Sequence, residues 1–227
     1  MLKEFFNTPL LTCLIVFVIA FLQVYLVVPN ITKVVKRRKL NDIPDQRSSH
    51  QAPTPTMAGV AFFFALIFSL FLIQKFDNQQ VAISMIASTS LIFLVALKDD
   101  LVTVRPSIKI ITEILSIIVL MYFTDFPVLD FHGFLGLNQL PLSVSYLIVL
   151  IGMLGIINSY NLIDGIDGLA AIIAMIIFSS FGLMFFVAGG LWFYVLICCS
   201  FVGMLGAYLI YNFSNKNKIF MGDTGSL

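Results

Sequence analysis

The sequence predicts an all-α fold: a polytopic membrane bundle of seven transmembrane helices with the N-terminus outside. Apolar residues make up 59% of the 227 residues and charged residues only 11%, less than half the roughly 25% usual in soluble domains. Long uncharged runs alternate with short polar segments, and basic residues follow the first run rather than precede it. We therefore expect a single integral membrane domain over residues 1–227 and exclude a soluble globular protein.

The predicted helices follow the apolar runs in order. Each run is near the ~20 residues that a helix needs to cross ~30 Å of hydrocarbon, and the shorter runs borrow flanking residues. The first run has no small-residue cleavage pattern, so it is expected to remain as an anchor rather than be removed as a signal peptide. The runs are Leu10–Val28, Met57–Ile73, Val81–Leu97, Ile108–Phe123, Pro141–Ile157, Leu169–Val187 and Leu191–Tyr211.

A basic cluster from Lys33 to Lys39 sets the orientation, because Lys and Arg near helix ends remain on the cytoplasmic side of the membrane. Alternation across seven spans places all Lys and Arg except Lys3 and Lys75 on that side. This distribution predicts a multi-pass protein of the inner (plasma) membrane. Its predicted cytoplasmic segments are 29–56, 98–107, 158–168 and 212–227.

The unusual polar groups all fall on the predicted cytoplasmic face. Asp99 and Asp100 end the third run, and two acids this close resist ionising together unless a cation lies beside them. A divalent metal would satisfy that requirement. The alternative is that both carboxylates mark the membrane boundary in water, and for this pair alone both interpretations stay open.

The stretch N-L-I-D-G-I-D-G-L-A begins at Asn161 and separates two apolar runs. Asp164 and Asp167, at i and i+3, share one face if the helix has already begun there, and Asn161 lies one turn earlier on that face. Gly165 and Gly168 remove side chains beside the acids, so that a phosphate can come close. Such oxygen donors suit a hard cation and the phosphates that it bridges. Helix capping by Asn161 and Asp164 is the alternative, but it leaves the second Asp-Gly unexplained.

Two further segments are weaker by themselves. M-G-D-T-G-S-L presents Asp223 among glycines and hydroxyls, which is one way to offer a carboxylate and backbone N–H groups to a phosphate. H-Q-A-P-T-P-T-M-A-G, from His50 to Gly59, begins a helix after two prolines. It either holds an anion at the helix start or is a stiff turn.

Lys109 lies at the start of the fourth predicted helix, with Glu113 one turn deeper. It could bind phosphate, or it could snorkel or pair with Glu113. Several Asp residues and a few cations on one cytoplasmic face describe phosphoryl transfer held together by Mg²⁺. The nearly balanced charges, 13 Lys and Arg against 12 Asp and Glu, give no reason to expect a nucleic-acid partner. No role is assigned to Cys13, Cys198 and Cys199.

Together, these four segments resemble the polyprenyl-phosphate N-acetylhexosamine-1-phosphate transferases, in order and on the expected face. The sequence is most similar to the branch that transfers N-acetylglucosamine 1-phosphate to undecaprenyl phosphate, and the branch that uses UDP-N-acetylmuramoyl-pentapeptide is the alternative. The resemblance implies a Mg²⁺-dependent enzyme, with Mn²⁺ as a substitute metal, that binds a UDP-N-acetylhexosamine and undecaprenyl phosphate in the lipid bilayer. It would release UMP and start a cell-envelope polysaccharide such as lipopolysaccharide. Whether it forms a homodimer stays open.

The resemblance also implies roles for individual residues. Asp99 and Asp100 match the family's acid pair, which would bind Mg²⁺ or deprotonate the lipid phosphate, and Asp223 matches a carboxylate implicated as a Mg²⁺ ligand. Asp164 and Asp167 match catalytic positions of the central nucleotide and metal motif. The implied substrate-binding residues are His50, Thr54, Pro55, Lys109 and Asn161.

Several features depart from the family pattern. Some relatives carry Lys where this chain has Gln51 and a second Gly where it has Ala58. In the muramoyl branch a Lys closely follows the acid pair, whereas L-V-T follows here. The family continues past G-D-T-G-S-L into further helices and a His-rich cytoplasmic loop. A chain that stops at Leu227 is therefore expected to be the N-terminal part of a longer transferase, without the complete sugar-nucleotide site.

Three other classes of protein fit less of the pattern. A CDP-alcohol phosphotransferase also uses Asp-Gly repeats, but it needs Arg after the first repeat and further Asp at helical spacing, where A-A-I-I-A-M-I-I follows here. An intramembrane aspartyl protease needs acids deep within two spans. An ion-coupled transporter would place its carboxylates at mid-membrane and show an internal repeat.

Overall fold

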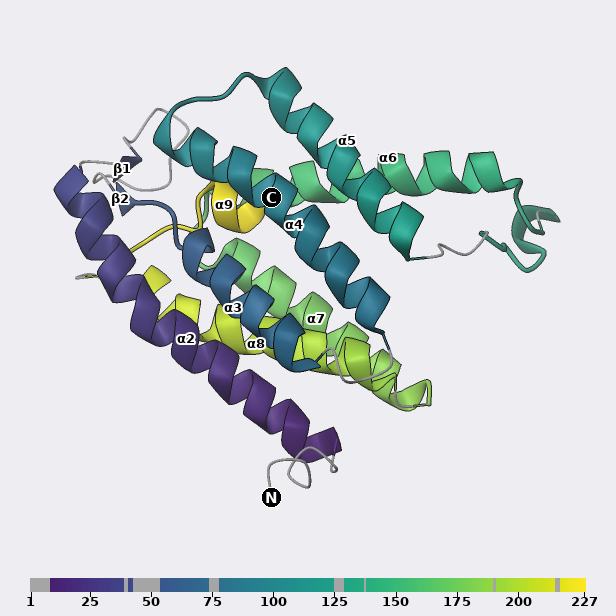
Figure 1. The fold of residues 1–227 in the computed structure, drawn as a ribbon, viewed down its shortest axis with the longest axis horizontal. Coiled ribbons are helices and arrows are strands. Elements are labelled where there is room, and N and C mark those ends of the chain that lie inside the picture. Colours follow the sequence, from purple (N-terminus) through teal and green to yellow (C-terminus); the bar gives the residue numbers. More distant parts are fainter. Residues whose placement is uncertain are drawn as a thin grey trace.

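The computed structural model describes residues 9–38, 41–42, 54–73, 78–124, 129–136, 138–189, 191–214 and 217–227. These segments form an all-α bundle, as predicted, with one pair of two-residue strands that align antiparallel (Figure 1). The elements are α2 Pro9–Arg38, β1 Asn41–Asp42, β2 Thr54–Pro55, α3 Gly59–Ile73, α4 Gln79–Leu101, α5 Pro106–Phe123, η1 Phe134–Gly136, α6 Leu142–Ile163, α7 Leu169–Val187, α8 Trp192–Asn212 and α9 Asp223–Ser226.

Six helices, α2 and α4 to α8, are long and apolar enough to cross a membrane. The remaining predicted span, α3, is apolar but has 15 residues. At 1.5 Å per residue such a helix is roughly 22 Å long, which is shorter than ~30 Å of hydrocarbon. The polytopic bundle is thus confirmed, and α3 needs its flanking residues to cross.

Helix α8 forms the centre of the bundle. Of the residues in its 18-residue apolar stretch, 61% are buried, whereas 6% are buried in the corresponding stretch of α6. It packs against α2, α3 and α7. Where α8 meets α2, a Cβ added at Gly203 would lie 2.5 Å from the carbonyl oxygen of Phe17. Glycine is needed there because the two helix backbones touch, a common packing mode between membrane helices.

Helix α2 continues past its predicted end at Val28 as far as Arg38. Pro29 lies inside it and lacks the N–H that would bond to the carbonyl of Tyr25. The hydroxyl of Tyr211, on α8, donates to that carbonyl at 2.6 Å. Because α8 supplies the missing hydrogen bond, the helix continues, and Arg38 lies on a helical turn rather than in the predicted loop.

The polar segments predicted to share one face meet at one end of the bundle (Figure 1). Helix α9 lies there and contacts α3, α4 and α6. The end of α4, the end of α6 and the start of α3 therefore surround the last turn of the described chain. This arrangement brings together side chains that are far apart in the sequence.

Candidate active site

The segment before α9 is held by the segment that leads into α3. The N–H of Phe220 donates to the carbonyl of Pro55 at 2.8 Å. In return, the N–H groups of Ala58 and Gly59 donate to the carbonyls of Phe220 and Met221, each at 3.1 Å. Two motifs that looked weak in the sequence thus form one backbone-paired unit.

Two glycines allow α9 to approach its neighbours. A Cβ at Gly59 would lie 2.1 Å from the backbone nitrogen of Gly225, so α3 and α9 meet at their backbones. Gly222 has φ +70°, in a region that side chains disfavour, and its Cβ would lie 2.7 Å from Oδ2 of Asp100. Both positions require glycine for the site to close.

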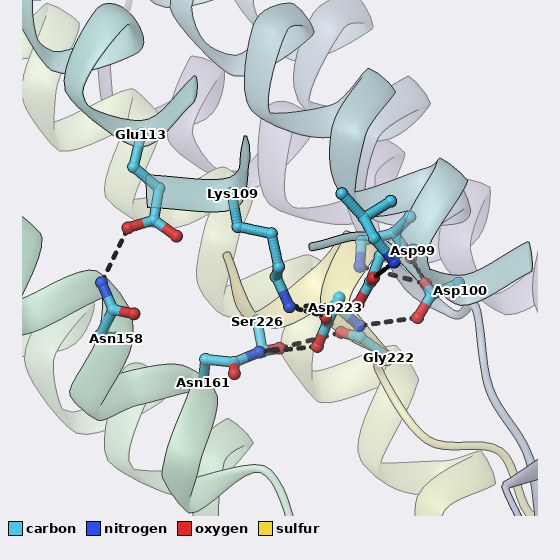
Figure 2. Close-up of polar contacts among 11 residues, drawn as sticks. Asp99, Asp100, Lys109, Glu113, Asn158, Asn161, Gly222, Asp223 and Ser226 are labelled. Carbon is cyan, nitrogen blue, oxygen red and sulfur yellow. Dashed lines mark hydrogen bonds and ion pairs between the residues drawn. The ribbon is translucent and has the colours of Figure 1, made fainter. Parts of the chain in front are cut away.

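Asp100, at the end of α4, binds the start of α9 (Figure 2). Its carboxylate accepts hydrogen bonds from the N–H groups of Asp223 and Thr224 at 2.9 and 3.1 Å, and from the Thr224 hydroxyl at 2.8 Å. These N–H groups have no partner within so short a helix. Asp100 therefore fixes the position of Asp223 by hydrogen bonds that involve an ionised acceptor.

Lys109 lies between two carboxylates. Its Nζ is 3.1 Å from Oδ2 of Asp99 and also contacts Oδ2 of Asp223. The other oxygen of Asp99 accepts the N–H of Val104, which stabilises the turn between α4 and α5. Pro106 begins α5, and its fixed φ favours a helix start that points Lys109 back toward the acid pair.

Asn161, on the last turn of α6, binds the other oxygen of the Asp223 carboxylate (Figure 2). Its Nδ2 donates to Oδ1 of Asp223 at 2.9 Å and to the hydroxyl of Ser226 at 2.8 Å. Asp223 is therefore held by α5 through Lys109 and by α6 through Asn161.

Asp164 lies in the turn that follows α6. Burial, together with the negative charges of Asp223 and Asp100, raises the pKa of Asp164 to about 8. A hydrogen bond from the N–H of Gly222 favours the ionised form but does not outweigh these effects. Asp164 is thus poised to exchange a proton near neutral pH.

Asp164 and Asp167 do not form the helical ladder that their spacing suggested, because α6 ends before Asp164 and α7 begins after Gly168. Asp167 instead pairs with Lys218, with Oδ2 and Nζ 2.5 Å apart. Gly168 has φ +72°, and its N–H donates to the side-chain oxygen of Asn212 at 2.7 Å. Gly168 thus forms the turn rather than clearing space for a phosphate.

Asn212 was not among the predicted site residues, yet it joins the two polar loops. It is buried at the end of α8. Its Nδ2 donates to the hydroxyl of Tyr208 at 2.8 Å and to the carbonyl of Ile219 at 3.1 Å, while its oxygen accepts from Gly168. The sequence signal was a lone amide ending an apolar run, which does not reveal its partners.

The remaining predicted residues have different placements. Thr54 and Pro55 form β2 and support the segment before α9, whereas His50 lies outside the described residues. Lys109 contacts Asp99 and Asp223, and Glu113 accepts a hydrogen bond from Asn158 at 2.7 Å. The structure therefore gives Lys109 partners that the sequence did not predict: it pairs with Asp99 and Asp223 rather than with Glu113.

The donors around Lys109 fit the implied divalent metal. Oδ2 of Asp99 and Oδ2 of Asp223 face one ammonium, and carboxylate oxygens are the ligands that Mg²⁺ prefers. Across the described ranges, no three carboxylate, imidazole or thiolate groups form a metal site by themselves, so a metal here would need water or substrate phosphate as further ligands. Lys109 supplies the positive charge that keeps the two acids together.

An apolar cavity of about 280 Å³ opens beside α9. Helices α3, α6, α7 and α8 line it with aromatic and aliphatic side chains, and Ser226, which Asn161 binds, is also among its lining residues. A mostly apolar cavity that shares Ser226 with the polar cluster suits an amphiphile with an anionic head.

Spanning helices, clustered carboxylates and an adjoining apolar cavity define an integral membrane enzyme. Residues 82–227 match the model of glycosyl transferase family 4. Phospho-N-acetylmuramoyl-pentapeptide-transferases from staphylococci are similar over most of the chain. The enzyme of Staphylococcus carnosus is 29% identical and that of Staphylococcus haemolyticus 30% identical, each over 92% of this chain and 71% of the relative. The enzyme of Staphylococcus aureus strain MSSA476 is 28% identical over 94% of this chain and 71% of the relative. The chain therefore belongs to glycosyl transferase family 4 and is a phospho-sugar transferase.

Proposed function

We propose that the protein transfers an N-acetylhexosamine 1-phosphate, most readily N-acetylglucosamine 1-phosphate, from a UDP-sugar to undecaprenyl phosphate. The reaction would depend on Mg²⁺, release UMP and start a cell-envelope polysaccharide on the cytoplasmic face of the inner membrane. The contact of Lys109 with both Asp99 and Asp223, beside an apolar cavity, is the observation that carries this proposal. An acid cluster beside an apolar cavity supports the proposal because a polyprenyl phosphate carries an anionic head on an apolar chain.

The proposed transfer is a displacement at phosphorus. An oxygen of the lipid phosphate forms a bond to the β-phosphorus of the UDP-sugar, the bond from that phosphorus to the bridging oxygen breaks, and UMP leaves with the electron pair. Asp99 and Asp223 would hold Mg²⁺, which when bound neutralises the pyrophosphate. Lys109 is placed to bind a phosphate oxygen once a metal takes over its two carboxylates.

Two carboxylates have supporting tasks in this proposal. Asp100 keeps Asp223 in place through the backbone of α9. Asp164, which is protonated below a pKa raised to about 8, would act as general base in its ionised form and take the proton of the lipid phosphate as its oxygen attacks. A direct displacement and a route through a phospho-aspartate both fit these residues.

Transfer of phospho-N-acetylmuramoyl-pentapeptide is the second candidate, and the staphylococcal relatives favour it. Against it, L-V-T follows Asp100 where that branch carries a Lys. Identities near 30% establish the family of the protein, but they do not establish which sugar it transfers.

An assay of UMP release would test the proposal on membranes that contain the full-length gene product. UDP-N-acetylglucosamine and UDP-N-acetylmuramoyl-pentapeptide are compared, each with and without undecaprenyl phosphate and Mg²⁺. We expect continuous release only with the first sugar, lipid and metal together. Release that ignores lipid or metal would contradict the transferase. One UMP per enzyme without lipid would indicate the two-step route.

Asp100→Asn and Asp164→Asn test the site within the same assay. Each is expected to abolish turnover while the amount of folded protein stays unchanged. Asp130→Asn is the matched control, because Asp130 lies in the loop between α5 and α6, beside His132. Turnover retained in either site variant would remove that residue from the mechanism.

A further inference from the structure

Glu113 and Asn158 form a hydrogen bond between two membrane-spanning helices, away from the reacting groups. Nδ2 of Asn158, on α6, donates to Oε2 of Glu113, on α5, at 2.7 Å (Figure 2). Glu113 is only 2% exposed. An ionisable side chain inside a membrane helix is expensive to insert and is usually kept for a function. The proposed transfer gives neither residue a task.

The pair lies one helical turn from the carboxylate site on both helices. On α5, Lys109 precedes Glu113 by four residues, and on α6, Asn161 follows Asn158 by three. Residues so spaced lie on the same face of a helix. Lys109 and Asn161 each bind one oxygen of Asp223. The two helices thus carry two polar layers: Glu113 with Asn158 at the left of Figure 2, and beside it Lys109 and Asn161 around Asp223.

Helix α6 has little other packing to fix its position. Only 6% of its apolar stretch is buried, and Ser145, at the opposite end, is its buried residue. Apolar contacts with lipid do not select one spacing between helices, whereas a hydrogen bond in an apolar setting does. Tyr160 and Ile163, near the end that carries Asn161, pack partly buried against the core, so polar contacts fix how this end of α6 lies relative to α5 and α9.

We infer that Glu113 and Asn158 are positioning residues: their hydrogen bond sets the spacing of α5 and α6, and so places Lys109 and Asn161 on the two oxygens of Asp223. This inference rests on the proposed function: Asn161 orients Asp223 through its other oxygen and does not occupy the oxygen that Lys109 contacts, so a misplaced Asn161 would leave Asp223 misoriented and weaken binding of the metal. Glu113→Gln keeps an oxygen that can accept the Asn158 hydrogen bond. Glu113→Leu and Asn158→Leu remove the bond from either side.

The test measures Mn²⁺ binding by electron paramagnetic resonance, together with thermal unfolding and the kinetics of UMP release, on the full-length gene product in detergent. Supporting groups of this kind change metal affinity by about 10- to 100-fold. We expect at least a tenfold rise in the Mn²⁺ concentration for half-saturation in both Leu variants. The rate at saturating substrate should fall, and Glu113→Gln should bind Mn²⁺ like the wild type. Thr112→Val, which removes a hydroxyl bonded within α5 to Ile108, is the matched control.

Three results would overturn the inference. A lower unfolding temperature with unchanged Mn²⁺ affinity would mean that the pair only stabilises the fold. A Gln variant as defective as the Leu variant would mean that the charge of Glu113 matters rather than the bond. A wild type that binds no Mn²⁺ and releases no UMP would remove the proposed function and this inference with it. If Glu113→Leu does not insert into the membrane, the Mn²⁺ affinity of Asn158→Leu alone tests the inference.

Discussion

Lys109 lies where a divalent cation would compete with it. Its ammonium contacts one oxygen each of Asp99 and Asp223, so without metal it prevents the two carboxylates from repelling each other. A metal that binds the same oxygens would free the ammonium for a phosphate. One lysine thereby stabilises the empty site and serves the loaded one.

Lys109→Met is therefore expected to destabilise the metal-free protein and to make Mg²⁺ more stabilising. The ion pairs are partly exposed, so the loss is on the order of 1 kcal/mol, or about 2–4 °C in a chain of this size. Thermal unfolding with and without Mg²⁺ checks this, with Lys98→Met as a control that removes an exposed ammonium from α4. Equal stabilisation of variant and wild type by Mg²⁺ would contradict the competition.

Gly222→Ala is expected to remove most of the transfer activity while the protein still inserts. The new Cβ would lie 2.7 Å from Oδ2 and 2.9 Å from Oδ1 of Asp100, so Asp100 would have to release the backbone of α9. A small misplacement of reacting groups costs up to about a hundredfold in rate. UMP release is the measurement, and Gly152→Ala on α6 is the comparison, because a Cβ there meets open space.

Asp164 predicts a pH dependence of stability in the metal-free protein. Its pKa is raised from 3.8 to about 8, so between those values the folded state keeps a proton that the unfolded state has lost. Its contribution to stability is complete below the unfolded value and is lost as pH rises through the folded one. The unfolding temperature in EDTA should fall as the pH rises toward about 8 and level off above that value, and Asp164→Asn should flatten this decline. An equally steep decline in the variant would assign the effect to other groups.

At the scale of helices, α2 and α8 are joined by the hydroxyl of Tyr211, which replaces the hydrogen bond that Pro29 removes. Tyr211→Phe keeps the ring packed beside Tyr25 but loses this bond, at about 1 kcal/mol. In a Pro29→Ala background the new N–H can bond to the carbonyl of Tyr25, so Tyr211→Phe should cost less there. Thermal unfolding of the four proteins gives the coupling. An equal loss in both backgrounds would contradict this account.

The sequence predicted the helices better than their ends. Apolar runs mark what lies in hydrocarbon, whereas a helix continues until its hydrogen bonds are interrupted, so α2 reaches Arg38 and α6 reaches Ile163. For the same reason Asn158 and Asn161 are helical although both were expected in a loop. The four polar segments were found because charge is rare in this chain. The Glu113–Asn158 pair was not found, because which side chains meet depends on how α5 and α6 pack.

At the scale of the whole molecule, the site lies where two unequally packed parts meet. Helices α2, α3 and α7 pack around α8, while α5 and α6 lie to one side (Figure 1). Few residues of α6 are buried. Helix α9 contacts α3 from the first part and α6 from the second. Relative movement of the two parts would therefore change the geometry around Asp223 before it disturbed the core.

Cysteine labelling tests this architecture by showing on which side of the membrane the carboxylate site and the loop between α5 and α6 lie. Alternation of the helices predicts that Lys98 and Asn217, both exposed, lie on the cytoplasmic side, and that Asn138, in the loop between α5 and α6, lies outside. With Cys13, Cys198 and Cys199 replaced by Ala, single cysteines at these positions are labelled with an impermeant maleimide. Asn138→Cys should react in intact cells, and Lys98→Cys and Asn217→Cys only after permeabilisation. Reaction of Lys98→Cys and Asn217→Cys from opposite sides would separate Asp99 from Asp223 and exclude a shared site, because each label lies close in sequence to one of these carboxylates.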